Sequence, residues 1–183
     1  MRHLPNLICL ARIALIWPIA VALIGGNYDL ALFLLTAAAV SDGLDGYLAK
    51  RFGWTSELGK ILDPLADKLL LITLFLVGAW IGLVPWWLTL TAVTRDVGIV
   101  IGAFVWRFWI GPFSVGPSII SKINTGLQLA YLLGVITHAA ALVPPQGFLS
   151  TLAVIIVGTT FFSGVNYAVV FARRASAARA KTE

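Results

Sequence analysis

The sequence predicts an all-α membrane protein, a single bundle of six transmembrane helices with both termini in the cytoplasm. Sixty per cent of its 183 residues are hydrophobic and 11% are charged, which is too apolar for a soluble domain of this length. Residues 69–94 and 123–172 contain no Lys, Arg, Asp or Glu, and about 20 apolar residues are enough for a helix to cross the hydrocarbon core. We therefore expect residues 1–183 to form one transmembrane domain that ends in a short basic cytoplasmic tail from about residue 172.

Glycines, prolines and charged residues divide the apolar sequence into six segments. The first segment ends at residues 25–29, which contain two Gly, the second at the charged run 50–57, and the third at the Gly-Leu-Val-Pro of 82–85. The fourth ends in residues 109–118, which hold two Gly and two Pro, and the fifth in the Val-Pro-Pro-Gln-Gly of 143–147. The predicted helices are Leu7–Ile24, Leu30–Ala49, Leu58–Trp80, Pro85–Phe108, Ile119–Leu142 and Phe148–Phe171. Because every connector is short, neighbouring helices are expected to run antiparallel in one bundle.

The basic residues predict the orientation. Lys and Arg occur at the N-terminus, at the second connector, around the fourth connector and at the C-terminus, whereas the other three connectors contain none. With an even number of helices, this asymmetry places both termini in the cytoplasm. The sequence pI of about 9.7 then reflects topology and attraction to anionic lipids. No nucleic-acid partner is expected, because such a partner needs a basic face on a soluble surface.

Two further features concern the compartment. The first predicted helix begins within a few residues of Met1, without a transit peptide, so we expect a bacterial cytoplasmic membrane. Cys9 is the only cysteine, which excludes a disulfide within the chain and a thiolate metal site.

The stretch SDGLDGYLAKRFGWTSELGKILDPLADK, residues 41–68, concentrates charge in this apolar chain. Asp42 and Asp45 lie three residues apart near the end of the second predicted helix. Asp63 and Asp67 lie four residues apart in the first turns of the third. Each pair therefore shares one helical face, and two adjacent antiparallel helices can aim the four carboxylates at one point on the cytoplasmic side.

Four carboxylates at one point indicate a bound cation. They repel one another, and a single charged residue at a helix centre in a membrane costs about 2.5–3.5 kcal/mol. Only oxygen ligands are offered, which favours Mg²⁺ or Mn²⁺ over Zn²⁺ or copper. The carboxylates are enough for two ions, an arrangement that stabilises the attacking and leaving oxygens in phosphoryl transfer.

The residues around the carboxylates fit a polyphosphate ester. The glycines leave space for a phosphate or nucleotide beside the backbone, and the cations attract its negative charge. The glycines are Gly43, Gly46 and Gly59, and the cations are Lys50, Arg51, Lys60 and Lys68.

The same stretch resembles the signature of the CDP-alcohol phosphatidyltransferase family. DGLDGYLAK, eight residues and GKILDPLAD match Asp-x-x-Asp-Gly-x-x-Ala-Arg, eight residues and Gly-x-x-x-Asp-x-x-x-Asp at every spacing. The resemblance implies that two Mg²⁺ or Mn²⁺ ions are bound, and that Asp67 is both a shared ligand and the general base for an incoming hydroxyl. The other implied ligands are Asp42, Asp45 and Asp63.

The resemblance also implies a site for a CDP-linked lipid, in which Gly46 and Gly59 admit the cytidine diphosphate. Lys50 stands where the family usually has Arg. This keeps the charge but loses the bidentate fork for a phosphate. Arg51 is about 100° further round the helix, so either Lys50 or Arg51 could hold the diphosphate.

Polar residues of the fourth and fifth predicted helices are expected to line the acceptor pocket, since they interrupt apolar segments near the cytoplasmic face. They are Arg95, Asp96, Arg107, Lys122 and Asn124. The stretches that contain them, TRDVGIVIGAFVWR and SIISKINTGLQ, are similar to the CMP-forming, eukaryotic-type cardiolipin synthases. That resemblance implies transfer from CDP-diacylglycerol to phosphatidylglycerol, and a homodimer.

The close alternative is a phosphatidylglycerophosphate synthase, which uses glycerol 3-phosphate. Those enzymes tend to have Arg-Glu in place of Arg95-Asp96 and Lys-x-Lys-Thr in place of residues 122–125. Glycerol 3-phosphate carries more negative charge than the phosphodiester of phosphatidylglycerol, so Asn124 in place of a Lys suits the lipid acceptor.

The charged residues allow other interpretations. The four Asp could form ion pairs at the headgroup level, or belong to a cation transporter. A transporter needs polar residues across the membrane, whereas three predicted helices become wholly apolar away from the cytoplasm. Arg95 and Asp96 could be a buried ion pair that fixes helix packing. Arg12 is interpreted as a snorkelling cation or a contact to a lipid phosphate.

Overall fold

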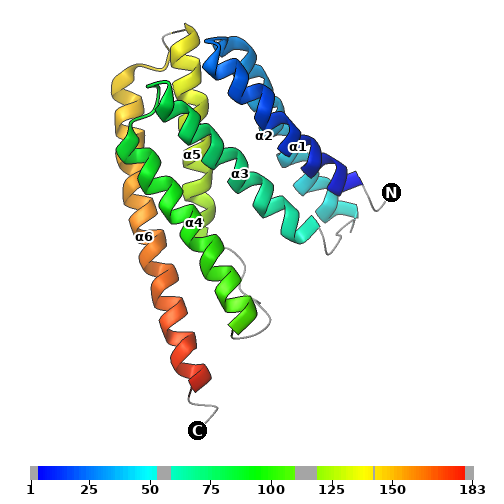
Figure 1. The fold of residues 1–183 in the computed structure, drawn as a ribbon, viewed down its shortest axis with the longest axis vertical. Helices are drawn as coiled ribbons and strands as arrows, with labels where there is room; N and C mark the ends of the chain where they lie inside the picture. Colours follow the sequence, from blue (N-terminus) through cyan, green and yellow to red (C-terminus); the bar gives the residue numbers. More distant parts are fainter. Residues whose placement is uncertain (1–3, 53–58, 110–118, 142, 180–183) are drawn as a thin grey trace.

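The computed structural model describes residues 4–52, 59–109, 119–141 and 143–179. Side chains are described for residues 10–41, 43, 65–102, 119–141 and 143–165. Within these residues the chain consists of six α-helices joined by turns, with no β-strand, which confirms the all-α prediction (Figure 1). The helices are α1 (Leu4–Ile24), α2 (Tyr28–Phe52), α3 (Gly59–Trp80), α4 (Trp86–Trp109), α5 (Ile119–Ala141) and α6 (Gln146–Arg179).

Two helix ends differ clearly from the prediction. Helix α2 continues to Phe52, so Lys50 and Arg51 lie in the helix and not in the connector. Helix α6 continues to Arg179, far beyond the predicted end at Phe171. The apolar pattern marks where a helix stops being hydrophobic, but residues 165–179 contain no Gly or Pro and are rich in Ala and Arg, which favour helix.

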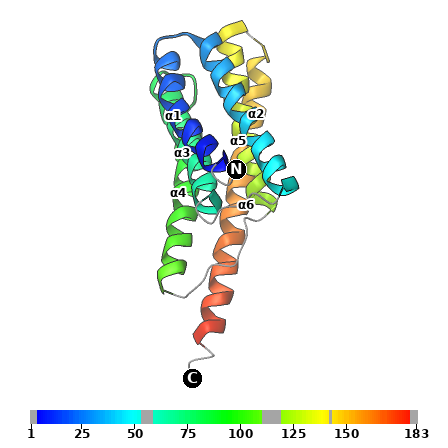
Figure 2. The same ribbon diagram turned by 90° about the vertical axis from the view of Figure 1, so that its right-hand side faces the viewer.

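The helices are arranged as three hairpins. The α1–α2, α3–α4 and α5–α6 turns all lie at one end of the molecule, at the top of Figure 1. We call this the turn end. Helix α1 packs against α2 and α3, α5 packs against α6 and α2, and α4 lies between α3 and α6. Figure 2 shows α1 and α3 on one side of the molecule and α2 with α5 on the other.

The packing of α2 and α3 differs from the simple adjacency expected from the sequence. In the described contacts, both helices pack mainly on α1, and α5 also touches both. In the described residues, the two helices that carry the acidic signature therefore pack against α1 and α5 more than against each other.

The bundle has an apolar half and a polar half. Near the turn end the core is fully buried hydrocarbon from five helices: Ile19, Leu35, Leu74, Leu88 and Ile156. Apart from Thr89, which lies near the start of α4, the buried polar and charged residues that are described lie further from the turns on the same helices or on α5. They include Arg12, Arg95, Asp96, Ser121, Asn124, Gln128, Thr160 and Ser163. We call this half the polar end, because the described charges inside the bundle gather there.

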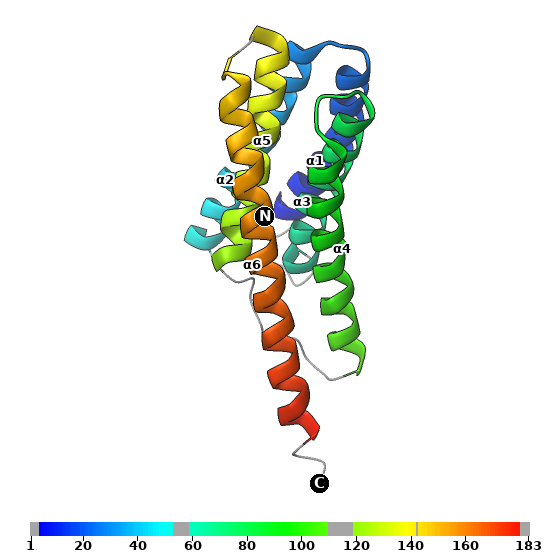
Figure 3. The same ribbon diagram turned by 90° about the vertical axis from the view of Figure 1, so that its left-hand side faces the viewer.

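Two of the helices whose side chains are described are long and apolar enough to cross a membrane, by length and composition. They are α5, with 23 residues, and the first 20 residues of α6, Gln146–Val165. A six-span topology and the cytoplasmic position of the termini stay predictions. In Figure 3 the C-terminal part of α6 extends beyond the ends of the other helices.

The turn between α3 and α4 depends on glycine. Gly82 adopts a left-handed conformation with φ of 79°, which costs a residue with a side chain more than it costs glycine. The Gly78 carbonyl accepts the backbone N–H groups of Leu83 and Val84, at 2.8 and 3.0 Å. A Cβ on Gly78 would lie 2.8 Å from Cγ2 of Val84, so the turn closes directly onto the helix.

We predict that Gly78→Ala destabilises the protein by about 1–3 kcal/mol, because the buried and rotationally restricted Val84 must shift. Thermal unfolding of the purified chain in detergent would measure the effect. The control is Gly126→Ala on α5, where nothing lies within 4 Å of the new Cβ. Alanine should stabilise that helix by up to about 1 kcal/mol. Equal effects at the two positions would contradict this account of the turn.

Candidate active site

A buried ion pair joins α1 to α3. Arg12 is 4% exposed, and its guanidinium donates a hydrogen bond to Oδ1 of Asp67, whose side chain is 38% exposed. A charged side chain is costly to bury without a partner of opposite charge. The interpretation of Arg12 as a snorkelling cation is therefore wrong, because its charged group lies inside the bundle against a carboxylate.

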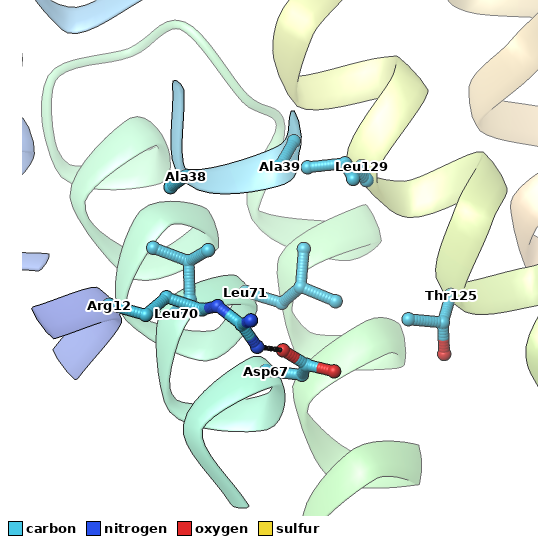
Figure 4. A pocket seen from close by; sticks show the side chains of 8 residues that line it. All are labelled: Arg12, Ala38, Ala39, Asp67, Leu70, Leu71, Thr125 and Leu129. Atoms are coloured by element: carbon cyan, nitrogen blue, oxygen red, sulfur yellow. Dashed lines mark hydrogen bonds and ion pairs between the residues drawn. The ribbon is translucent and has the colours of Figure 1, made fainter. Parts of the chain in front are cut away.

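Arg12 and Asp67 line a small cavity of about 70 Å³ between α1, α2, α3 and α5. Figure 4 shows Arg12 reaching from α1 to Asp67, with Thr125 of α5 on the other side. The remaining lining residues whose side chains are described are apolar: Ala38, Ala39, Leu70, Leu71 and Leu129. Pockets for small molecules have volumes of about 300–1,000 Å³. The cavity thus suits an ion, a water or a single hydroxyl group beside Asp67, and is too small for a nucleotide.

A second charged cluster lies at the next residue of α3. Lys68 Nζ and Arg95 Nη1 each donate to Oδ1 of Asp96, both at 2.6 Å. Arg95 Nη2 donates to Ser121 Oγ at 2.6 Å and to Ser163 Oγ at 2.7 Å. The cluster joins α3, α4, α5 and α6, and it sets two cations against one carboxylate that is 2% exposed.

Polar contacts continue between α5 and α6. Asn124 is completely buried, and its Oδ1 accepts hydrogen bonds from Thr159 at 2.7 Å and Thr160 at 3.1 Å. Thr125 accepts a long 3.4 Å hydrogen bond from Lys68 Nζ and also lines the cavity beside Asp67. Thr125 therefore connects the cavity to the second charged cluster.

The described acceptor-site candidates do not share one open pocket. Arg95, Asp96 and Asn124 are buried in contacts between helices, whereas Lys122 is exposed on α5. Both terminal nitrogens of Arg95 are used within the bundle. The ion pair considered from the sequence is therefore present, and a role of these residues in binding the acceptor stays a prediction.

Most residues of the acidic signature lie outside the described side chains, although their backbones belong to described helices. These residues are Asp42, Asp45, Gly46, Lys50 and Arg51 on α2, and Gly59 and Asp63 on α3. The side chain of Arg107, on α4, also lies outside the described ones. Among the side chains that are described, no three potential metal ligands form a group. The clustering of the four carboxylates thus stays a prediction.

The surroundings of Asp67 fit a divalent cation. Its carboxylate borders a cavity, the nearby Thr125 offers a further oxygen, and hard cations such as Mg²⁺ and Mn²⁺ prefer oxygen ligands. The carboxylate already holds one positive group, the guanidinium of Arg12. Asp67 could therefore act as a metal ligand, with the three other Asp of the signature as the implied partners.

Sequence reasoning missed several residues that organise this region. Arg12 was not assigned to the site, and Lys68 was expected to attract a phosphate and not to pair with Asp96. Ser121 and Ser163 were not considered. A charge inside an apolar helix was the available signal for Arg12. The two serines offered none, because their role depends on which helices pack together.

Comparisons with known proteins give a consistent family. A family model described as CDP-alcohol phosphatidyltransferase matches residues 2–172. The chain is 36% identical over 143 residues to the "Probable cardiolipin synthase (CMP-forming)" of Drosophila melanogaster. It is 31% identical over 142 residues to the "Cardiolipin synthase (CMP-forming)" of Homo sapiens. Each match covers 69% of this chain, but only 44% and 47% of the respective relative, so the chain spans about half the length of these proteins.

A bacterial relative matches over more of its length. The "Probable phosphatidylglycerophosphate synthase" of Mycobacterium tuberculosis is 30% identical over 176 residues. That match covers 90% of this chain and 79% of the relative. The similarity therefore extends to proteins named for two different acceptors.

We predict that Asp96→Asn destabilises the protein by about 3–5 kcal/mol, because it leaves the buried cations Lys68 and Arg95 without their carboxylate. Ser163→Ala is the matched control: it removes one hydrogen-bond acceptor of the same Arg95, and should cost about 1 kcal/mol. Unfolding of the purified variants in the same detergent would compare them. A smaller loss for Asp96→Asn than for Ser163→Ala would show that the cluster is not held by its charge.

Proposed function

The chain belongs to the CDP-alcohol phosphatidyltransferase family, and from that premise we propose that it transfers the phosphatidyl group of CDP-diacylglycerol to phosphatidylglycerol. The products would be cardiolipin and CMP. The observation that carries the proposal is the position of Asp67, the last Asp of the family signature, beside a cavity bordered by α1, α2, α3 and α5. The higher identity to proteins named CMP-forming cardiolipin synthases supports this acceptor.

The reaction requires a base next to a space that admits a hydroxyl group. The acceptor oxygen attacks the phosphorus of the phosphatidyl group, and the bond from that phosphorus to the oxygen of CMP breaks. Asp67 takes the proton of the attacking hydroxyl, a role that needs hydrogen-bond reach. The cavity beside its carboxylate is large enough for such a hydroxyl.

The proposal includes two divalent cations, Mg²⁺ or Mn²⁺. When bound, such ions neutralise a diphosphate and stabilise the departing phosphate oxygen. The four Asp of the signature would hold them, and Gly46 and Gly59 would admit the cytidine diphosphate. Either Lys50 or Arg51 would contact the diphosphate.

Phosphatidylglycerophosphate synthesis is the second candidate. Its support is the match to the bacterial relative over 90% of this chain. Asn124 favours the lipid acceptor, because it brings no charge to the site. Glycerol 3-phosphate carries close to two negative charges, and its binding requires several cations. Arg95, Asp96, Arg107 and Lys122 are the other residues proposed to influence acceptor choice.

The proposed setting is a membrane, with the polar end of the bundle toward the cytoplasm and a homodimer as the working unit. The apolar α5 and α6 support membrane insertion, and the distribution of Lys and Arg supports the orientation. Helix α6 has 34 residues, about 51 Å at 1.5 Å per residue, which exceeds a hydrocarbon core of about 30 Å. Its basic C-terminal turns would then lie at or beyond the headgroups.

The decisive experiment supplies the purified chain with CDP-diacylglycerol and Mg²⁺ or Mn²⁺, and with either phosphatidylglycerol or glycerol 3-phosphate. CMP release and the lipid product are measured together. We expect cardiolipin with phosphatidylglycerol alone, loss of activity with EDTA, and a decrease of at least about 100-fold for Asp67→Asn, which removes a general base.

Product with glycerol 3-phosphate alone would establish the second candidate instead. An Asp67→Asn variant as active as the wild type would remove Asp67 from the mechanism. A protein without CMP release under any of these conditions would contradict the proposed activity.

A further inference from the structure

We propose that Arg12 is an internal counter-ion of the metal site, which occupies Asp67 when no metal is bound and is displaced when a divalent cation binds. This inference rests on the proposed function, because it takes Asp67 as a metal ligand. It gives Arg12 a role as a positioning residue that acts through Asp67.

Arg12 places a positive charge inside the bundle. Its side chain is only 4% exposed, and a charge buried to this degree needs a partner of opposite charge. It reaches the carboxylate of Asp67 from a different helix, α1. The ion pair sets the positive charge of Arg12 against the negative charge of Asp67.

Asp67 has space for another cation. Its side chain is 38% exposed, and the adjoining cavity of about 70 Å³ can hold an ion. A divalent ion on the same carboxylate would repel the guanidinium, because two positive charges at short range repel each other. Metal and Arg12 are therefore competitors for Asp67.

The other two described cations inside the bundle contact a different carboxylate. Lys68 and Arg95 both contact Asp96. Lys68 and Arg95 can keep their contacts with Asp96 when a metal binds at Asp67, whereas the contact between Arg12 and Asp67 must change. Arg12 is thus the described cation whose position must respond to metal loading.

Competition and a purely structural contact predict different effects of removing Arg12 on the metal affinity. If Arg12 and the metal compete, removal of Arg12 tightens metal binding. If Arg12 only holds Asp67 in place as a structural contact, its removal weakens metal binding or leaves it unchanged. Once released, the planar guanidinium matches two oxygens of a phosphate group, so the diphosphate of the CDP-linked lipid is the partner that it would then take.

The test measures Mn²⁺ binding to the purified chain in detergent, from the EPR signal of free Mn²⁺. Arg12→Gln should bind Mn²⁺ roughly 5- to 150-fold more tightly than the wild type, the range of typical coupling between two sites. CDP-diacylglycerol should increase the Mn²⁺ affinity of the wild type more than that of Arg12→Gln. Arg12→Lys retains the charge without the fork, and its affinity should lie between the two.

Two controls accompany these variants. Arg95→Gln removes another buried guanidinium from a different carboxylate, and its Mn²⁺ affinity should stay near the wild-type value. Asp67→Asn should weaken Mn²⁺ binding. If Arg12→Gln does not fold, Arg12→Lys supplies the answer, since tighter binding than in the wild type is still expected.

The outcomes separate this inference from the proposed function. Wild-type binding that depends on Asp67, with affinity unchanged or weaker in the Arg12 variants, would overturn the inference and leave the proposed function standing. Absence of Mn²⁺ binding in the wild type, or binding that does not depend on Asp67, would overturn the proposed metal site and this inference with it.

Discussion

The polar end of this bundle depends on one constraint: a charge inside an apolar bundle must touch an opposite charge. Arg12 with Asp67 ties α1 to α3, and Lys68 with Arg95 and Asp96 ties α3 to α4. Hydrogen bonds from Arg95 to serines extend the second cluster to α5 and α6. The turn end, in contrast, has a core of packed hydrocarbon and, among the described side chains, no ion pair between helices. The described helices are thus joined in two different ways along their length.

The same constraint fixes the rotation of α3. Asp67 and Lys68 are consecutive residues, so their side chains leave the helix about 100° apart, one toward Arg12 of α1 and the other toward Asp96 of α4. A rotation of α3 that relaxed one ion pair would stretch the other. The carboxylate of Asp67 is therefore held at the cavity by contacts on both sides of its helix, before any ligand arrives.

The sequence was sufficient for the helices and for the location of the acidic signature, because both are local patterns. Apolar segments interrupted by Gly, Pro and charge correspond to the described helices, but the ends of α2 and α6 were placed too early because hydropathy does not measure helix propensity. Partners across helices could not be predicted. Arg12 meets Asp67, and Asn124 meets Thr159, only because of how α1 packs on α3 and α6 on α5.

The adjacent opposite charges of α4 have a consequence for biogenesis. Insertion scales assign about 2.5–3.5 kcal/mol to each charged residue at a helix centre, so an Arg and an Asp entering the bilayer separately would strongly oppose insertion. Arg95 and Asp96 are neighbours in the chain and bonded to each other, so in the proposed membrane setting α4 would enter the bilayer with its own counter-ion. Lys68 of α3 lies earlier in the chain and also contacts Asp96, so α3 would offer the carboxylate a second partner when α4 packs against it.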